Sequence, residues 1–201
     1  MRSAGRLERL ELNYNRFETL DWLAAQNFLV LQSLSIAHND LDSLAPLLAV
    51  TQLRELNVRN NRLVDIEPVF ALTDLELADL GGNRIASAEG MNALANLRRL
   101  FLDRNRLASS RGLEGLVWLE ELDLSSNPLV NVSHLAELQR LQRLDLSHTA
   151  IEDLSGILTL GDIEVLRLHG DLALSCDDVA AAIAEFGAPA VRHDLNCSQG
   201  T

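Results

Sequence analysis

A repeat of 22 residues constrains this chain more than any other feature. Units that open on Leu or Ile begin at positions 7, 31, 53, 75, 97, 119, 141 and 163, so every unit has 22 residues except the first, which has 24. Counted from zero within a unit, apolar residues recur at positions 0, 3, 5, 10, 13 and 16, and position 8 is usually Asn. Such internal repetition predicts stacked units that bury one continuous core.

The spacing inside a unit predicts its local structure. In the unit that opens at Leu119, Leu122 and Leu124 stand one residue apart, so both point to one side of a strand while Asp123 points to the other. The chain between successive strands must cross over, so we expect parallel strands in one sheet with one face in solvent. From position 10 onward the apolar spacing becomes three, which favours an irregular or 3₁₀ segment behind the sheet.

The recurrent Asn at position 8 is interpreted as structural. Buried backbone in the turns must find hydrogen-bond partners, and an Asn side chain both donates and accepts. We therefore expect a ladder of amides through the units, which fades where the last two units carry Thr149 and Asp171 instead. Its members are Asn15, Asn39, Asn61, Asn83, Asn105 and Asn127.

The pattern resembles the leucine-rich repeat, LxxLxLxxNxLxxLxxLxxL, from Leu7 to Leu174. Segments 63–75 and 151–163 are similar to the 22-residue class found in bacterial internalins and in a regulator of a Ser/Thr protein phosphatase. The resemblance implies an α/β repeat solenoid, a right-handed curved superhelix with a concave parallel sheet, an irregular or 3₁₀ convex side and a C-terminal helical cap. It also implies a protein-binding module and not an enzyme. We expect eight repeats in residues 1–174 and a cap in residues 175–201.

The cap itself has a helical pattern. Ser175 and Asp178 are typical of a helix start, and Gly187 and Pro189 of a helix end. Between them, one apolar face is formed by Val179, Ala182, Ile183 and Phe186. Residues 191–195 are expected to add a last extended segment.

Two cysteines flank this helix. Cys176 falls at position 13 of the eighth unit, an inward position, and Cys197 follows 21 residues later. They are similar to the pairs that close the caps of exported leucine-rich repeats, which implies a Cys176–Cys197 disulfide worth about 3 kcal/mol and an extracytoplasmic location. The first residues carry no secretion signal. We give the disulfide more weight, because a signal peptide is removed from a mature chain; free cysteines would instead indicate a cytoplasmic protein.

The N-terminal end of the core is less clearly covered, because the first strand begins near Leu7 with no helix ahead of it. Either a preceding segment covers this end, or the enlarged first unit folds over it with Trp22, Phe28 and Leu29. In both cases Trp22 is interpreted as a packing residue.

Composition excludes several classes of partner. The chain has 29 acidic residues against 17 arginines and a net charge of −12, which disfavours nucleic acids and anionic membranes. No apolar run is long enough to insert into a membrane. We expect one elongated monomeric domain without cofactors.

Catalytic and metal sites are not favoured by the pattern. Asp123 and Asp145 are neighbours in one column, but Arg143 and Arg167 beside them are expected to keep both carboxylates ionised. His148, His169 and Asp171 could meet near one rim and hold a metal ion, but ordinary surface histidines explain these positions better.

A partner surface is predicted on the solvent face of the sheet, at positions 2, 4 and 6 of each unit with position 7 at the rim. These 32 positions hold seven carboxylates and six arginines. Leu77 and Phe101 lie on a diagonal between adjacent strands, about 8 Å apart. An apolar centre with arginines and a polar rim is typical of a protein-binding hot spot. The surrounding charged residues are Arg59, Arg99, Arg104, Asp79 and Asp103.

These observations favour an exported bacterial-type module that binds a protein partner. Two alternatives remain open, a cytoplasmic regulatory scaffold that docks on an enzyme such as a phosphatase, and the recognition arm of a larger adhesin or enzyme. Sugar binding on the sheet face is less favoured, because its only aromatic residues, Tyr14 and Phe101, lie four units apart.

Overall fold

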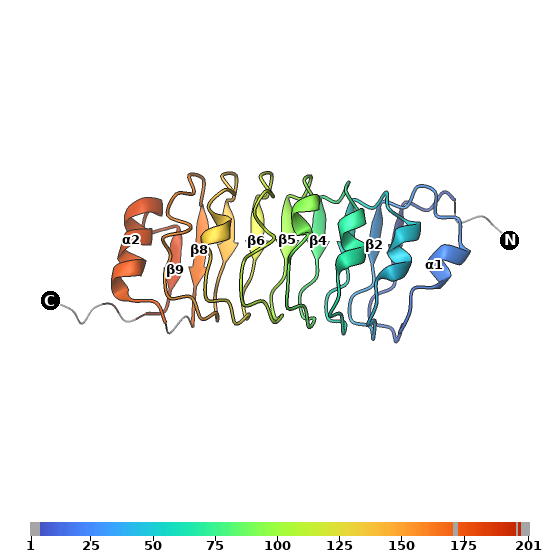
Figure 1. The fold of residues 1–201 in the computed structure, drawn as a ribbon, viewed down its shortest axis with the longest axis horizontal. Helices are drawn as coiled ribbons and strands as arrows, with labels where there is room; N and C mark the ends of the chain where they lie inside the picture. Colours follow the sequence, from blue (N-terminus) through green and yellow to red (C-terminus); the bar gives the residue numbers. More distant parts are fainter. Residues whose placement is uncertain (1–4, 171–172, 196, 198–201) are drawn as a thin grey trace.

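The computed structural model describes residues 5–170, 173–195 and 197, and in this part of the chain nine strands form one parallel sheet in sequence order (Figure 1). Every strand but the last repeats the same positions of a unit, so the register advances by whole units, as in Leu56↔Ala78 and Leu100↔Leu122. The strands are β1 Arg9–Glu11, β2 Ser33–Ser35, β3 Glu55–Asn57, β4 Leu77–Asp79, β5 Arg99–Phe101, β6 Glu121–Asp123, β7 Arg143–Asp145, β8 Val165–Leu168 and β9 Val191–His193.

Short 3₁₀ helices cover one face of this sheet, and the other face carries none (Figure 1). They occupy the segment in which the apolar spacing is three, and in η1 and η2 a proline stands in the first turn, where its missing N–H costs nothing. The predicted repeat solenoid with a parallel sheet and a 3₁₀ side is therefore confirmed. These helices are η1 Ala45–Ala49, η2 Glu67–Ala71, η3 Met91–Ala93 and η4 Ser133–Leu135.

The core runs without a break between the sheet and the 3₁₀ side. The repeated leucines of the inner units, such as Leu53, Leu97 and Leu141, have no exposed surface. Asn127 shows how the turns are satisfied: its Nδ2 donates to the carbonyls of Leu102 and Leu124, both at 2.9 Å, and its Oδ1 accepts from the Leu107 N–H at 2.9 Å. Asn39, Asn61, Asn83 and Asn105 make the same bonds, so each amide joins adjacent units.

The C-terminal end is closed by α2, Cys176–Phe186, and by β9 (Figure 1). Ser175 and Asp178 form a reciprocal capping box at the start of α2, and Gly187 with φ of 86° ends it. Val179 and Ala182 are buried against the last repeat, while Ile183 and Phe186 are half-buried beside them.

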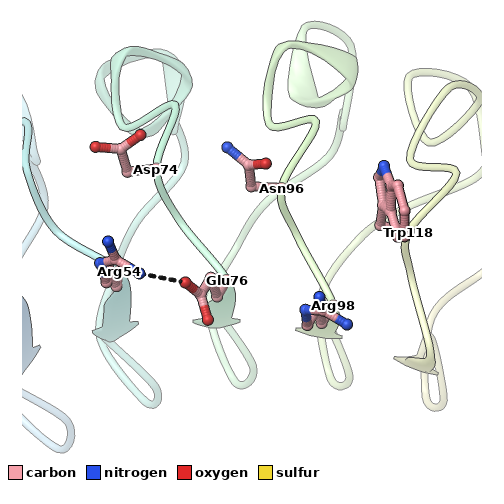
Figure 2. A pocket seen from close by; sticks show the side chains of 6 residues that line it. All are labelled: Arg54, Asp74, Glu76, Asn96, Arg98 and Trp118. Carbon is pink, nitrogen blue, oxygen red and sulfur yellow. Dashed lines mark hydrogen bonds and ion pairs between the residues drawn. The ribbon is translucent and has the colours of Figure 1, made fainter.

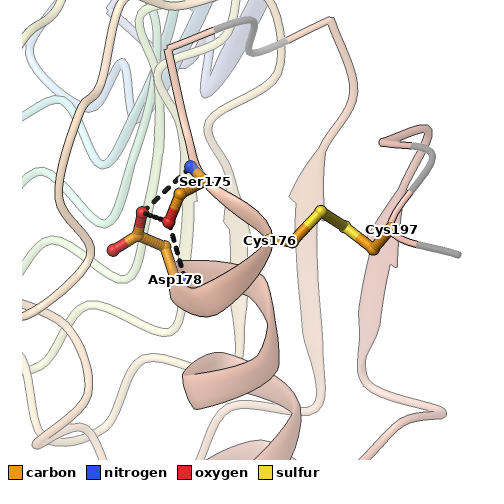
Figure 3. Close-up of a disulfide and its surroundings, with 4 residues drawn as sticks. All are labelled: Ser175, Cys176, Asp178 and Cys197. Atoms are coloured by element: carbon orange, nitrogen blue, oxygen red, sulfur yellow. Dashed lines mark hydrogen bonds between the residues drawn. A yellow bond between two sulfur atoms is a disulfide. The ribbon is translucent and has the colours of Figure 1, made fainter. Parts of the chain in front are cut away.

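Cys176 and Cys197 are joined by a disulfide with a Cα–Cα distance of 5.4 Å (Figure 3). The expectation that Cys176 points inward was wrong, because the residue is exposed. The repeat stops after Leu174, so Cys176 stands on the first turn of α2 and not at position 13 of a unit. The bridge thus ties the outside of the cap helix to the segment that follows β9.

At the N-terminal end the enlarged first unit contains α1, Trp22–Ala25. Trp22 contacts Phe17 and Phe28, with ring centroids 6.1 and 6.0 Å apart, so it packs as expected. Phe28 is buried, but Leu29 is 67% exposed and does not help to cover the core. Within the described residues, no helix is both long and apolar enough to cross a membrane.

Candidate protein-binding face

Leu77 and Phe101 lie on the open face of the sheet, in β4 and β5. The register pairs Leu77 with Arg99 and Asp79 with Phe101, so the two apolar side chains occupy the diagonal that the repeat predicts. Both are half-buried, whereas Ala78 and Leu100 between them point into the core and are fully buried. A cavity of about 240 Å³ adjoins Leu77 and is lined also by Ser33, Glu55 and Arg99.

An ion-pair cluster crosses three strands beside this pair. Arg59, after β3, reaches over the next unit to Asp103, after β5: its Nη1 donates to Asp103 Oδ1 at 2.9 Å, and its Nη2 also pairs with the same carboxylate. Arg59 Nη1 donates to Asp79 Oδ1 at 3.1 Å. The intervening position is Gly81, where a Cβ would lie 2.5 Å from both Arg59 Nη1 and Asp103 Oδ1, so the cluster requires glycine there.

Burial sets the electrostatics of this cluster. The Asp103 side chain is 6% exposed and that of Arg59 27%, so the two charges interact with little solvent between them. The hydrogen bond to Asp103 raises the pKa of Arg59 and keeps the guanidinium charged. Burial raises the pKa of Asp79, and the nearby Arg59 acts in the opposite direction. Arg59, Asp79 and Asp103 are thus paired with one another, which holds the three side chains in place; we call this cluster the frame.

The predicted contact residues therefore divide into two groups. Arg59, Asp79 and Asp103 are paired within the protein, whereas Arg99 and Arg104 are exposed and have no ion-pair partner among the described residues. Sequence spacing could not show this division, because the Arg59–Asp103 contact joins positions two units apart.

Asp123 borders the same patch, since it is the register partner of Phe101. Burial raises its pKa, and its Oδ1 accepts from the Ser125 N–H at 2.9 Å. The expected pairing with arginine was right only for Asp145, whose Oδ2 lies 3.4 Å from Arg167 Nη1. Arg143 pairs instead with Glu164 at 3.7 Å. Asp123 is thus a carboxylate without an ion pair among the described residues.

The rim of the face has a backbone feature that sequence reasoning missed. Position 7 of every unit has a φ between 52 and 70°, the left-handed region. The sequence did indicate this conformation, because position 7 holds Gly82, Gly170 and Asn60, and Gly and Asn tolerate a positive φ. Among the bulkier members, Tyr14 stacks on His38 with ring centroids 4.3 Å apart. The backbone therefore has the same conformation at position 7 of every unit along the rim.

The histidines considered as metal ligands lie at this rim. The backbone N–H of His148 donates to the backbone carbonyl of His169 at 2.6 Å. Asp171 lies outside the described residues. In residues 5–170, 173–195 and 197, no group of three His, Cys, Asp or Glu side chains is arranged to hold a metal ion.

A family model described as Leucine Rich repeats (2 copies) matches residues 95–137, which include β5 and β6. Together with the nine parallel strands and the Asn ladder, this match decides the class of fold. The chain folds as a leucine-rich-repeat solenoid. No curated protein sequence is similar enough to the chain to count as a relative.

Solved structures resemble this leucine-rich-repeat solenoid over almost its whole length. An internalin, InlF, from Listeria monocytogenes superimposes with a TM-score of 0.84 at 18% identity, over 96% of this chain and 61% of the internalin. The leucine-rich-repeat protein LIC12759 of Leptospira interrogans gives 0.84 at 25% identity, over 94% of this chain and 49% of its own. This chain thus spans about half to three fifths of the length of these two proteins. The fold is internalin-like.

A third similar structure contains a bound partner. It is the leucine-rich-repeat ectodomain of the Arabidopsis thaliana membrane receptor kinase GASSHO1/SCHENGEN3, in complex with CASPARIAN STRIP INTEGRITY FACTOR 2. The TM-score is 0.66 at 27% identity, over 81% of this chain and 21% of the receptor.

Proposed function

We propose that this protein is a non-catalytic recognition module that binds a protein partner through the open sheet face over β4, β5 and β6. The observation that carries the proposal is the diagonal of Leu77 and Phe101, two apolar side chains in adjacent units of a mostly polar face. Aromatic and arginine side chains supply most of the energy of protein interfaces. Two exposed arginines lie near the pair: Arg99 is the register partner of Leu77, and Arg104 follows Phe101 by three residues.

The frame beside the patch supports this role. Because Arg59, Asp79 and Asp103 hold one another and Gly81 leaves room for them, the surface next to Leu77 and Phe101 is ordered before a partner arrives. Preorganised surfaces lose less side-chain entropy on binding. The cluster is therefore assigned a positioning role, and direct contact is assigned to the apolar pair with Arg99 and Arg104.

Asp123 indicates one feature of the partner. A half-buried carboxylate next to an aromatic ring favours a cation, which gains both the ion pair and the ring contact. The partner is expected to present a Lys or Arg side chain between Asp123 and Phe101, and an apolar side chain against Leu77.

We further propose that the module works outside the cytoplasm, in a bacterium. Disulfides persist in oxidising compartments, and the Cys176–Cys197 bridge closes the cap. The similarity to internalins supports the same location, and the plant receptor ectodomain with its bound factor is a precedent for ligand binding on this fold. A thiol count on unreduced, denatured protein from the native host tests this: two reactive thiols would instead support a cytoplasmic regulatory scaffold.

The binding face is tested by site-specific photo-crosslinking. A benzophenone amino acid replaces Phe101 in one variant and Val64, which is 61% exposed on the 3₁₀ side, in the other. We expect a protein of the cell surroundings to be captured from position 101 and not from position 64. Equal capture from both positions, or capture from position 64 alone, contradicts the proposal.

The captured partner then allows a quantitative comparison. Phe101→Ala should weaken the Kd by about 30-fold, the size of a hot-spot loss. Leu48→Ala, on the exposed side of η1, is the matched control and should leave the Kd unchanged. Thermal melting should differ little between the two variants, and equal affinities would refute the assignment of Phe101.

A further inference from the structure

A second polar cavity lies away from the sheet face, along the side of the solenoid where the chain enters β3, β4, β5 and β6 (Figure 2). Its volume is about 440 Å³, within the range of small-molecule sites. Six residues from positions 1 and 21 of successive units line it: Arg54, Asp74, Glu76, Asn96, Arg98 and Trp118.

Trp118 forms one end of this cavity (Figure 2). The guanidinium carbon of Arg140 lies 3.7 Å from the centroid of its ring and covers one face. Arg140 does not line the cavity, so the other face of the indole is turned toward it. Trp118 is 41% exposed, and no described aromatic ring stacks on it. The ring is thus a supported flat platform with one free side.

The charges around the cavity balance. Arg54 and Glu76 form an ion pair at 2.8 Å along its floor, as Figure 2 shows, and Arg98 pairs with Glu120 at 2.6 Å. Two arginines and two carboxylates line the space, so the lining has no net charge, and each arginine is already paired with a carboxylate. A phosphate therefore finds no unpaired arginine, and the Asp74 carboxylate is left to accept hydrogen bonds from a neutral polar ligand.

Hydrogen-bonding groups nevertheless remain available in it. The Asp74 carboxylate has no ion-pair or hydrogen-bond partner within the described residues. Asn96 uses its Nδ2 on the Thr73 carbonyl at 3.0 Å, which leaves its Oδ1 to accept. Arg54 and Arg98 each use one Nη1 in an ion pair and keep further N–H donors. Acceptors and donors thus alternate around the cavity, the arrangement that ring hydroxyls require.

We propose that this cavity binds a neutral saccharide, with the C–H face of one pyranose ring stacked on Trp118 and its hydroxyls bonded to Asp74, Asn96 and Arg98. Sugar binding is disfavoured on the sheet face, where the aromatic residues Tyr14 and Phe101 lie four units apart, but Trp118 lies outside that face. Trp118 stands at position 21 of its unit. Stacking of the units brings it beside the polar residues at positions 1 and 21 of the neighbouring units.

The proposal is tested by saturation-transfer NMR on the whole chain. The probes are the methyl glycosides of D-glucose, D-galactose and D-mannose and N-acetyl-D-glucosamine, with tetramethylammonium and methyl phosphate as charged controls whose methyl protons report transfer. We expect transfer to the ring C–H protons of at least one saccharide and to neither control. No transfer to any of the four saccharides overturns the proposal, as does transfer to tetramethylammonium or methyl phosphate alone.

Variants locate the binding. Trp118→Ala should weaken saccharide binding by about tenfold, the value of one aromatic stack, and Asp74→Ala should weaken it too. The matched control is Trp22→Phe, which alters the other tryptophan of the chain, and it should bind as the parent does. Binding that survives Trp118→Ala unchanged would refute the site. A glycopeptide with the same terminal sugar distinguishes sources: tighter binding than to the methyl glycoside indicates a glycoprotein, and equal binding a free or polymeric sugar.

Discussion

The two ends of the solenoid are covered in different ways. At the C-terminal end the repeat gives way to α2, β9 and a disulfide, and the last repeated strand keeps Leu166 and Leu168 fully buried. At the N-terminal end, Leu10 and Leu12 of the first unit are half-buried, and Leu7 is 38% exposed. An apolar cavity of about 450 Å³ opens there, lined by Leu7, Leu10, Leu12, Phe17, Trp22, Gln26 and Phe28.

The difference between the two ends shows that the outer side of an end unit needs a cover other than a neighbouring repeat. An inner unit buries its leucines between two neighbours, whereas an end unit has one neighbour, so its other side needs a different cover. The C-terminal cover is a new element with its own helix cap and a covalent tie. The described N-terminal cover is only a longer turn with α1 and an aromatic cluster. We therefore expect local stability to rise from β1 toward the middle of the sheet and to stay high through α2.

The largest difference in stability is expected when the leucine at position 3 is replaced in an inner unit and, separately, in the first unit. Leu100→Ala removes a fully buried side chain and should lower the free energy of unfolding by about 2–5 kcal/mol. Leu10→Ala, at the equivalent position of the half-covered first unit, should cost about 1 kcal/mol because less surface leaves the core. Urea denaturation followed by circular dichroism measures both, and equal losses would break the comparison.

The next effect concerns the covalent tie. Replacing both Cys176 and Cys197 by Ser should destabilise the C-terminal cap by about 3 kcal/mol, since the closed loop is about 20 residues long. Hydrogen exchange in α2 should accelerate while β4 to β6 change little. A reducing agent should destabilise the parent chain and leave the double variant unaffected. Unchanged exchange in α2 would mean that the helix packing alone closes this end.

A smaller difference is expected in the Asn ladder. Asn105 is buried, accepts from the Ile85 N–H at 3.0 Å and donates to carbonyls of two units, so Asn105→Ala should cost about 1–3 kcal/mol. Asn15 is exposed, and among the described residues its Nδ2 donates only to the carbonyls of Leu12 and Asn13 in its own turn, so Asn15→Ala should cost about 0.5 kcal/mol. Thermal melting of the two variants side by side decides whether the ladder weakens at the open end.

The smallest effect is pH-dependent and belongs to the C-terminal end. Asp194, which follows β9, accepts from the Gly170 N–H at 3.0 Å, and this bond lowers the pKa of the carboxyl below its ordinary 3.8. Because the pKa of Asp194 is lower in the folded state, the stabilisation that this carboxylate gives is present above its ordinary pKa. That stabilisation is lost as the pH falls through the lowered pKa. The Gly170 amide proton should therefore shift in that range by NMR. Asp194→Asn should abolish the step, and a step that persists would assign it to another group.

Much of the architecture follows from the sequence period. The strand positions, the 3₁₀ side and the diagonal of Leu77 and Phe101 all depend on spacing within or between units. The cap helix Cys176–Phe186 lies beyond the repeats, and its start and end signals predicted it. Periodicity carries this information because every unit must present the same apolar set to its neighbours.

Other features depend on side-chain geometry that spacing does not encode. Arg59 pairs with Asp103 across Gly81 only because the long side chain can lie over a residue without a Cβ. Trp118 and Asp74 belong to different units, and their shared cavity arises from stacking. Leu29 looked suited to cover the core, yet the turn of the enlarged first unit directs it outward. These contacts join residues whose separation is set by the fold.

Residue-resolved hydrogen exchange of the free protein tests the account most directly. The amides of β1 and of residues 12–30 should exchange fastest among the repeats, those of β4 to β8 slowest, and α2 should be protected as long as the disulfide is intact. Protection of β1 as strong as that of β5 would contradict the account, because it would mean that one neighbour stabilises a repeat as well as two.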